Sequence, residues 1–319
     1  MAFEDGLGSD SSQQREQNFT GSAYDLISRT ITLWARKIIH YIIIVGIIGA
    51  ACVTVSFLLL FSLYGAVNTI GADPLSYLIG YFFSTTTDTG FVLLSLGFTI
   101  FAFILNAIIY GAAIKFSLDE YGGPGGEVGS SFSHSFGRVL NFIIVQLILS
   151  FFVAILFIPA SNLLFQAMDV IDISDPFNPI FPAGSLEQLT LAMSILLVGG
   201  AFLIYINVRF APVLAVVIDT DLSPIDSLKR AWELTSGSFF HVFGSYILFN
   251  VAVLIIGIAI SFGVSVFLLP DDYSLVIDSI ISALLVSSLS FVFTVVLYRD
   301  LSSRIHTTTV SSSLDDLRV

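Results

Sequence analysis

Six long apolar runs, separated by polar segments, dominate the chain. Each run approaches or exceeds the ~20 apolar residues that an α-helix needs to cross the hydrocarbon core of a bilayer. The pattern therefore predicts an all-α, polytopic integral membrane helix bundle with six transmembrane helices. The predicted spans are residues 38–64, 91–114, 139–157, 189–208, 239–269 and 275–298.

Polar segments flank this predicted membrane domain, which covers residues 22–301. Residues 1–21 are rich in Gly, Ser, Gln and acidic residues and are expected to form a disordered cytoplasmic tail. Residues 302–319 are expected to form a second cytoplasmic tail. Within the domain, we expect the third span to reach Pro159, which disfavours a helix because proline removes a backbone hydrogen bond and clashes with the preceding turn. An apolar overhang to Met168 is the alternative.

A short polar helix is predicted between the fourth and fifth runs, over residues 224–236. Ser223 is a favourable N-cap, and Pro224 suits the first helical position. Asp226 places a carboxylate near the positive end of the helix. Gly237 is a natural stop for this helix.

Charged and apolar positions separate along this helix. Oppositely charged residues are spaced i,i+4, which favours ion pairs. The pairs are Asp226 with Arg230 and Lys229 with Glu233. The predicted apolar face consists of Ile225, Leu228, Ala231 and Trp232. Because apolar runs flank the helix, we expect a cytoplasmic amphipathic interfacial helix, and Ser22 with Asp25 predicts a second one before the first span.

The distribution of basic residues predicts the orientation. The three connections at 65–90, 158–188 and 270–274 contain none, so all twelve basic residues fall on the opposite side of the six-span arrangement. The positive-inside rule therefore places both termini in the cytoplasm of a multi-pass protein of the cell membrane.

Composition limits the chemistry. With 55% hydrophobic and 11% charged residues, the chain falls in the membrane class. A net charge of −12 with nine Arg against three Lys is typical of a salt-rich cytoplasm, such as that of a halophilic archaeon. The alternative is an acidic membrane protein whose loops lie in ordinary water. No basic stripe could neutralise phosphates, so nucleic-acid binding is not expected.

A weak internal repeat is visible. The pattern Ser131-x-x-x-Ser135-Phe136-x-Arg138 matches Ser223-x-x-x-Ser227-Leu228-x-Arg230. Each segment precedes a predicted span from the same side, so a true repeat would be parallel. Chance similarity in such a biased composition is the alternative.

The residues around the short polar helix resemble a known family. Arg209 ends a run, and a pattern of polar and apolar residues follows it: Ser223, Ser227, Leu228, Arg230, Trp232, Leu234, Thr235 and Gly237. This pattern resembles the membrane domain of some glycerophosphodiester phosphodiesterases and its stand-alone six-helix relatives in archaea and bacteria. The similarity covers residues 205–250 and, more weakly, 24–46. It implies a six-helix membrane domain of undefined role and does not carry over the enzymatic activity of the separate catalytic barrel.

Polar residues inside the predicted spans are the candidate site residues. Asn106, Gln146 and Asn250 each lie about 12–16 Å from the cytoplasmic end of a span, at a rise of 1.5 Å per residue, and so near the midplane. Such a cluster either binds a substrate or joins helices through hydrogen bonds. Neither catalytic residues nor a metal site is predicted, because the four histidines lack ligand spacing, and no cofactor is expected.

These patterns favour a non-enzymatic integral membrane protein that engages membrane lipids or a membrane-protein partner. The interfacial helix would contribute Ser223, Lys229, Arg230, Trp232 and Gly237. The alternative is a small transporter, or an accessory subunit of one, with a polar site near the midplane. An intramembrane lipid enzyme is the third hypothesis.

Overall fold

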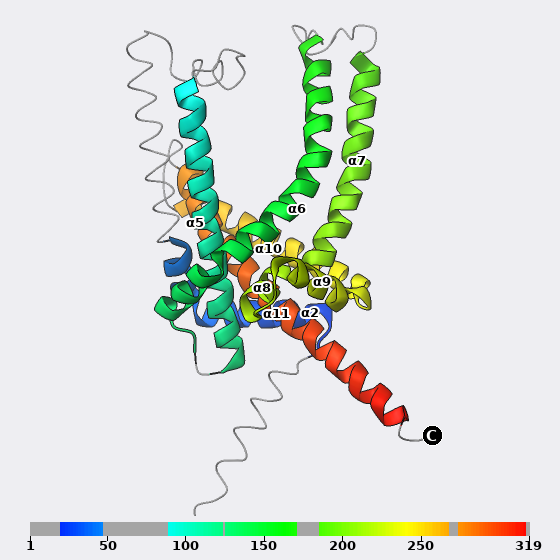
Figure 1. The fold of residues 1–319 in the computed structure, drawn as a ribbon. Helices are drawn as coiled ribbons and strands as arrows, with labels where there is room; N and C mark the ends of the chain where they lie inside the picture. Colours follow the sequence, from blue (N-terminus) through cyan, green and yellow to red (C-terminus); the bar gives the residue numbers. More distant parts are fainter. Residues whose placement is uncertain (1–19, 47–88, 124, 171–184, 268–273, 317–319) are drawn as a thin grey trace, which may run out of the picture.

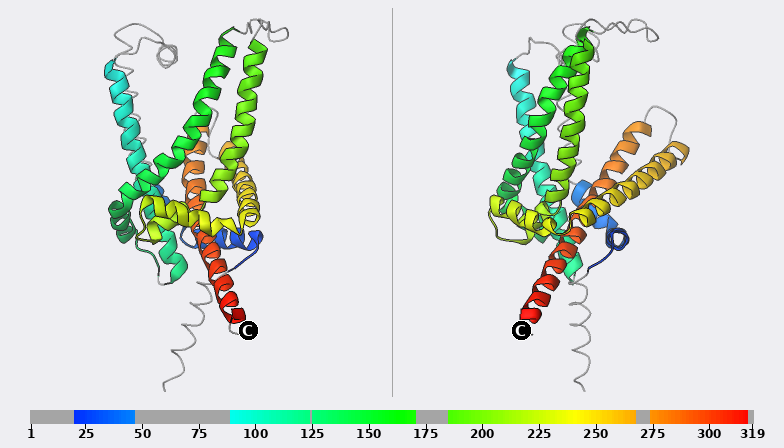
Figure 2. Two further views of the ribbon diagram at one scale, coloured as in Figure 1. Left: turned by 45° about the vertical axis from the view of Figure 1, so that its right-hand side comes forward. Right: turned by 90° about the vertical axis from the view of Figure 1, so that its right-hand side faces the viewer.

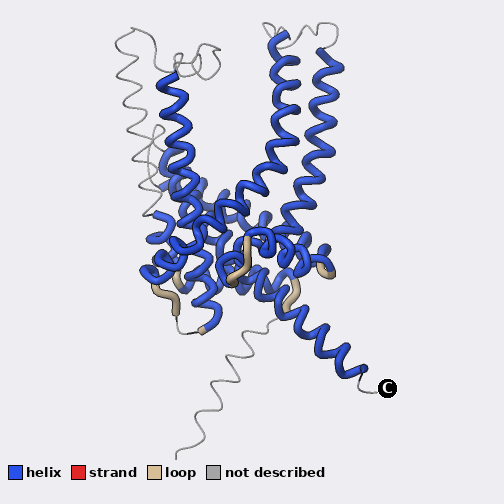
Figure 3. The backbone as a smooth tube through the Cα atoms, in the orientation of Figure 1, coloured by secondary structure: helices blue, strands red, loops and turns tan. Residues whose placement is uncertain are grey.

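The computed structural model describes residues 20–46, 89–123, 125–170, 185–267 and 274–316. All regular secondary structure within these ranges is helical (Figure 3). The labelled helices are α2 (Ala23–Arg36), α5 (Thr89–Gly122), α6 (Val128–Val170), α7 (Ser185–Phe210), α8 (Val213–Asp219), α9 (Pro224–Ser236), α10 (Phe239–Phe267) and α11 (Ser274–Asp316). Residues 38–46 are also helical.

Five helices in the described ranges are long and apolar enough to cross a membrane. These segments are Thr99–Gly122, Val128–Leu164, Leu186–Asp219, Phe239–Val264 and Leu284–Ile305. They correspond to the second to sixth predicted spans and indicate a helical, multi-pass membrane protein. The first predicted span lies outside the described residues beyond residue 46, as does most of the tail predicted at 1–21.

Several helices are longer than the sequence pattern predicts. α6 begins at Val128 and continues through Pro159 to Val170, so the helix does not stop at the proline and includes the overhang to Met168. α6 packs along α7, where Leu156 lies against Gly199, and Ala160 is fully buried. Packing on both sides of the proline outweighs the roughly 3 kcal/mol that an interior proline costs, and neighbouring helices in a membrane tolerate the loss of one hydrogen bond.

Polar contacts extend two other helices beyond their predicted spans. In α5, Lys115 pairs with Asp119 at 2.7 Å, one turn further on, and the helix continues to Gly122. In α11, Arg304 pairs with Asp300 at 2.8 Å, again at i,i+4. α11 therefore continues into the segment that was expected to be a tail at 302–319, and ends at Asp316.

The long helices diverge from a layer formed by α2, α8 and α9, which we call the shared layer. Figure 1 shows α2, α8 and α9 at the end of the bundle from which α5, α6 and α7 rise. The second view in Figure 2 shows α10 and α11 leaning away from α5, α6 and α7 as a packed pair. α11 crosses the shared layer and continues past it to the C-terminus (Figure 1). The layer is therefore the place where these groups of helices meet.

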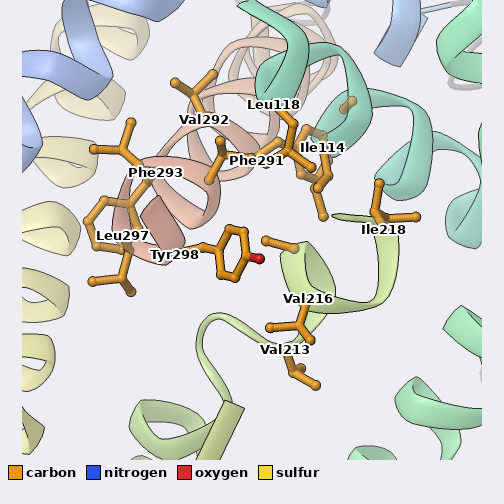
Figure 4. Close-up of a cluster of buried hydrophobic side chains, with 14 of the residues drawn as sticks. Ile114, Leu118, Val213, Val216, Ile218, Phe291, Val292, Phe293, Leu297 and Tyr298 are labelled. Carbon is orange, nitrogen blue, oxygen red and sulfur yellow. The ribbon is translucent and has the colours of Figure 1, made fainter. Parts of the chain in front are cut away.

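The hydrophobic core lies at this meeting point. Side chains of α5, α8 and α11 face one another there (Figure 4). The labelled core residues are Ile114, Leu118, Val213, Val216, Ile218, Phe291, Val292, Phe293, Leu297 and Tyr298. Away from the core, large apolar side chains on α6, α7 and α10 are exposed, including Phe151, Leu197, Val198, Leu254 and Phe262. A bilayer would cover such surfaces, which a water-soluble monomer rarely exposes to this extent.

Close packing at Gly111 gives a test of this core. A Cβ atom at Gly111 would overlap the Ser135 hydroxyl of α6 and lie 3.3 Å from Cδ1 of Ile218 in α8. We expect Gly111→Ala to lower the free energy of unfolding by about 1–3 kcal/mol, the usual cost of overpacking. Thermal and denaturant unfolding of the purified protein in detergent measures this loss.

The matched control is Gly97→Ala in the same helix, because no atom of another described segment lies within 4 Å of a Cβ placed there. We expect this change to be neutral or to stabilise by up to about 1 kcal/mol, since alanine favours a helix more than glycine does. Equal effects of the two substitutions would contradict the contact between α5, α6 and α8.

Candidate functional site

A cavity of about 480 Å³ lies where the groups of helices meet. α5, α6, α7, α10 and α11 line it, and α8 contributes Val213 and Leu214. Its aromatic lining consists of Phe103, Tyr110, Phe210, Tyr246, Phe291 and Phe293. None of the described residues that line it is charged. Its volume is in the range typical of small-molecule sites, about 300–1,000 Å³.

Ring contacts fix part of this lining. Tyr110 meets Phe291 edge to face at 4.6 Å between centroids, which joins α5 to α11. Phe249 of α10 stacks on Phe293 of α11 at 4.1 Å. Such contacts hold the aromatic wall of the cavity in place.

Gln146 of α6 is the most informative polar residue of the lining. Its Oε1 atom is buried and accepts no hydrogen bond from the described residues. An unsatisfied buried acceptor costs about 1–3 kcal/mol, so such an atom in a native structure calls for a partner. The residue lines the cavity, but this oxygen is itself closed to solvent.

Three other polar side chains of the lining each donate a hydrogen bond to a backbone carbonyl of their own helix. Ser290 donates its hydroxyl to the carbonyl of Val286 at 3.0 Å, and Thr294 donates to the carbonyl of Ser290 at 3.0 Å. Asn207 donates from Nδ2 to the carbonyl of Leu203 at 2.9 Å. Each of these side chains therefore keeps an oxygen that can accept a further hydrogen bond.

The structure does not bring the three predicted polar residues into one cluster. Gln146 lines the cavity, whereas the lining includes neither Asn106 nor Asn250. Both asparagines are exposed, and Asn250 donates to the carbonyl of Tyr246 in its own helix at 2.7 Å. In the structure, Asn250 therefore makes a hydrogen bond within its own helix.

α8 contributes Val213 and Leu214 to the cavity lining, and the sequence pattern did not predict this helix. Its residues from Ala215 to Ile218 are buried. Asp219 accepts a hydrogen bond from the Tyr298 hydroxyl at 2.8 Å and pairs with Arg299 at 3.3 Å, both from α11. The available signal was the apolar run that starts after Pro212 and ends at a charged residue, in a segment too short to span the bilayer.

Residues at the start of α6 hold the other side of α8. His134 contacts the carbonyl of Ile218 through Nε2 at 3.0 Å. Arg138 donates to the carbonyl of Thr220 and pairs with Asp221. α8 is thus fixed between α6 and α11 by side chains that lie outside the cavity.

The α9 helix has the predicted start. Ser223 is the N-cap and accepts a hydrogen bond from the Asp226 amide at 3.2 Å. The Ser223 hydroxyl donates to the Asp226 carboxylate at 2.7 Å, and Lys229 donates to it at 3.3 Å. These hydrogen bonds, that of Ser223 first, hold the pKa of Asp226 below its usual value. The helix ends at Gly237, which has φ −87° and so does not use the left-handed conformation.

The charge pairs and the buried face of α9 differ from the prediction. Ion pairs join residues three apart rather than four: Lys229 with Asp226 at 3.3 Å and Arg230 with Glu233 at 3.4 Å. The buried residues are Ser227, Ala231, Leu234 and Thr235. The predicted apolar residues Ile225 and Trp232 are 61% and 39% exposed. The buried face is therefore rotated toward small side chains, which let α9 approach its neighbours closely.

Trp232 contacts a cation rather than the core. The Arg209 guanidinium, at the end of α7, lies 4.7 Å from the Trp232 ring centroid and also faces the rings of Tyr205 and Phe239. Nε of Arg209 donates to the Tyr205 hydroxyl at 3.1 Å. These contacts join α7, α9 and α10 at the shared layer.

A buried carboxylate ties the start of the described chain to the layer. Asp300 of α11 is fully buried and accepts hydrogen bonds from the Gly21 amide at 2.9 Å and from Arg304 at 2.8 Å. His241 of α10 contacts it at 3.0 Å. Of the other histidines, His40 stacks on Phe116, whereas the His306 side chain lies outside the described residues. The described part of the chain holds no group of three potential metal-ligating side chains.

Comparison with protein families, curated proteins and solved structures finds no match to this chain. The cavity and the helices around it are therefore interpreted from their own geometry.

The contacts of Trp232 predict that substituting it destabilises the protein more than substituting the cations Lys229 and Arg230 of the same helix. We expect Trp232→Ala to lower the free energy of unfolding by about 1–2 kcal/mol, because it removes ring contacts and the cation–π contact with Arg209. The double variant Lys229→Gln/Arg230→Gln should change stability little, because exposed ion pairs contribute little. Unfolding in detergent compares the two, and an equal or larger loss in the double variant would contradict this assignment.

Proposed function

We propose that the chain is a non-enzymatic integral membrane protein of the cell membrane that engages membrane lipids. The observation that carries this proposal is the outer face of the helices at the shared layer, where exposed apolar side chains lie beside cations. On α9, Ile225 and Trp232 are exposed within one helix with Lys229 and Arg230. Such a face suits the boundary between acyl chains and headgroups.

Three segments of the layer repeat this arrangement. The pattern Ser-x-x-x-(Leu/Ser)-(Ile/Phe/Leu)-x-Arg begins at Ser22, Ser131 and Ser223. Four residues after each serine, the side chain is buried; these residues are Leu26, Ser135 and Ser227. Nine residues after each serine, a large apolar side chain is exposed; these residues are Ile31, Leu140 and Trp232. The recurrence of one exposed apolar position in three segments supports a common contact with lipid.

We further propose six spans, with both termini in the cytoplasm. Contacts at the shared layer gather basic residues from distant parts of the chain. Lys37 pairs with Glu120, Arg138 with Asp221 and Arg299 with Asp219. A basic residue near an anionic membrane surface contributes about 1 kcal/mol, so these cations orient the protein rather than capture lipid tightly.

Transport is the second candidate function, and the cavity of about 480 Å³, with polar residues such as Gln146 and Asn207 in its lining, is the observation in its favour. The mainly apolar and aromatic lining and the position of Asn106 and Asn250 outside the cavity favour lipid engagement instead. A membrane-protein partner would have to cover the same exposed faces as lipid. The resemblance of residues 205–250 to the membrane domain of glycerophosphodiester phosphodiesterases agrees with a non-catalytic membrane role.

The proposed topology can be tested by chemical labelling. With Cys52→Ser as background, Glu187→Cys should react with an impermeant maleimide added to intact cells. Ser130→Cys and Ser236→Cys should react only after permeabilisation. All three introduced sites are exposed in the structure, so access depends on sidedness alone. Labelling of Ser236→Cys in intact cells would refute the six-span arrangement.

Lipid contact at α9 can be tested with the two tryptophans of the chain. Trp34→Phe leaves Trp232 as the reporter, and Trp232→Phe leaves Trp34, whose Nε1 donates to Ser288 of α11 at 2.8 Å. In vesicles of brominated phosphatidylglycerol, we expect stronger fluorescence quenching of Trp232 than of Trp34. Quenching of Trp232 by aqueous iodide, without quenching by the brominated lipid, would place α9 in water and contradict the proposal.

A further inference from the structure

We infer that a groove between α2 and the end of α5 binds the phosphate of an anionic lipid headgroup. This inference rests on the proposed role in lipid engagement and names both the class of lipid and its site. It is carried by an arginine without a described partner, by the charges around that arginine and by the exposed apolar residues that follow it in the chain.

The groove has a volume of about 320 Å³. One wall is a stripe of α2 that runs from Asp25 to Arg36, and the other wall consists of Glu120 and Tyr121 of α5. The lining residues of α2 recur three or four positions apart, so they share one face of the helix. This volume lies at the lower end of the range for small-molecule sites, which suits a headgroup.

Both carboxylates of the groove are held by partners within the protein. Asp25 accepts hydrogen bonds from the amide and the hydroxyl of Ser22 at 2.9 and 2.6 Å. Glu120 pairs with Lys37 at 3.2 Å and accepts a hydrogen bond from the Gly126 amide at 2.9 Å. These carboxylates therefore serve to cap α2 and to join it to α5.

Arg36 is the group available to an outside anion. Its side chain is exposed and makes no hydrogen bond or ion pair with a described residue. Arg29, seven residues earlier on the same wall, lies 4.6 Å from the Tyr121 ring centroid. Among the described residues that line or border the groove, three cations stand against two carboxylates. A guanidinium can bind a phosphate through two parallel hydrogen bonds.

The residues after Arg36 favour a lipid as the source of the phosphate. Ile39 and Ile43, in the helical segment 38–46, are 67% and 43% exposed. Exposed apolar side chains beside a cation suit the boundary between acyl chains and headgroups. A lipid with its chains along Ile39 and Ile43 would have its headgroup at the level of Arg36. A soluble phosphate would gain nothing from these two side chains.

Two lipids with the same chains test the inference: dioleoyl phosphatidylglycerol, which is anionic, and dioleoyl phosphatidylcholine, whose phosphate already has a cation. Native mass spectrometry of the purified full-length protein in detergent measures the binding of each across a concentration series. We expect phosphatidylglycerol to bind about fivefold more tightly, the usual contribution of one basic residue beside anionic lipid. The negative end of α2 limits the preference to this size. Arg36→Gln should reduce it to less than about twofold.

Arg230→Gln is the matched control, because it removes the same charge from an exposed site on α9, where Arg230 pairs with Glu233 at 3.4 Å. This variant should keep the preference for phosphatidylglycerol. Ser28→Phe leaves the charge unchanged and fills the groove from its exposed α2 wall, so it should reduce the preference as Arg36→Gln does. All three variants should retain the helicity and melting temperature of the wild-type protein.

Equal binding of the two lipids to the wild-type protein would overturn the inference, and so would a preference that survives Arg36→Gln or Ser28→Phe. An equal loss in Arg230→Gln would indicate a general attraction of charge and would also overturn it. Inorganic phosphate that binds as tightly as phosphatidylglycerol, at matched ionic strength, would assign the groove to a soluble anion instead. The quenching of Trp232 by brominated lipid does not depend on Arg36, so failure here is distinguishable from failure of the proposed function.

Discussion

Asp219 ties the buried helix α8 to α11, and the arrangement of the other helices depends on this attachment. α8 contacts α5, α6, α9 and α11, and its Val213–Ile218 segment fills the space between them. The hydroxyl of Tyr298 and the guanidinium of Arg299 hold the Asp219 carboxylate, while Arg138 holds the carbonyl that follows it. Because the membrane-crossing helices diverge away from this layer (Figure 2), their relative positions are set here. α8 therefore both lines the cavity and connects the helices of the bundle.

Local signals were sufficient to predict the capped starts of α2 and α9, and insufficient to predict how the helices pack. The serine caps at Ser22 and Ser223 form as expected, because a capping interaction involves residues only three apart. The rotation of α9 is a tertiary property: small residues such as Ser227 and Ala231 face the bundle, and Trp232 turns to Arg209. α8 escaped prediction because an apolar segment of seven residues gives no clear helical period.

The depth of a side chain in the bilayer and the side of the helix on which it lies are separate properties. This difference explains why only one of the three predicted polar residues lines the cavity. A rise of about 1.5 Å per residue predicts how deep a side chain lies in a span, but says nothing about which side it faces. Asn106, Gln146 and Asn250 were assigned similar depths, yet only Gln146 lines the cavity. In uniformly apolar spans the hydrophobic pattern cannot orient the helix. The orientation follows from contacts such as Gly199 against Leu156, which are formed between spans.

The shared layer and the cavity divide the polar chemistry of the protein between charged and neutral groups. Pairs such as Lys37 with Glu120 and Arg138 with Asp221 lie in or next to the layer, where they join segments that are distant in sequence. The cavity is lined by residues of α5, α6, α7, α8, α10 and α11, so all the groups of helices contribute to it. Among the described residues, the polar groups of its lining are amides and hydroxyls, which a single hydrogen bond can satisfy, whereas a charge there would meet no described partner of opposite sign.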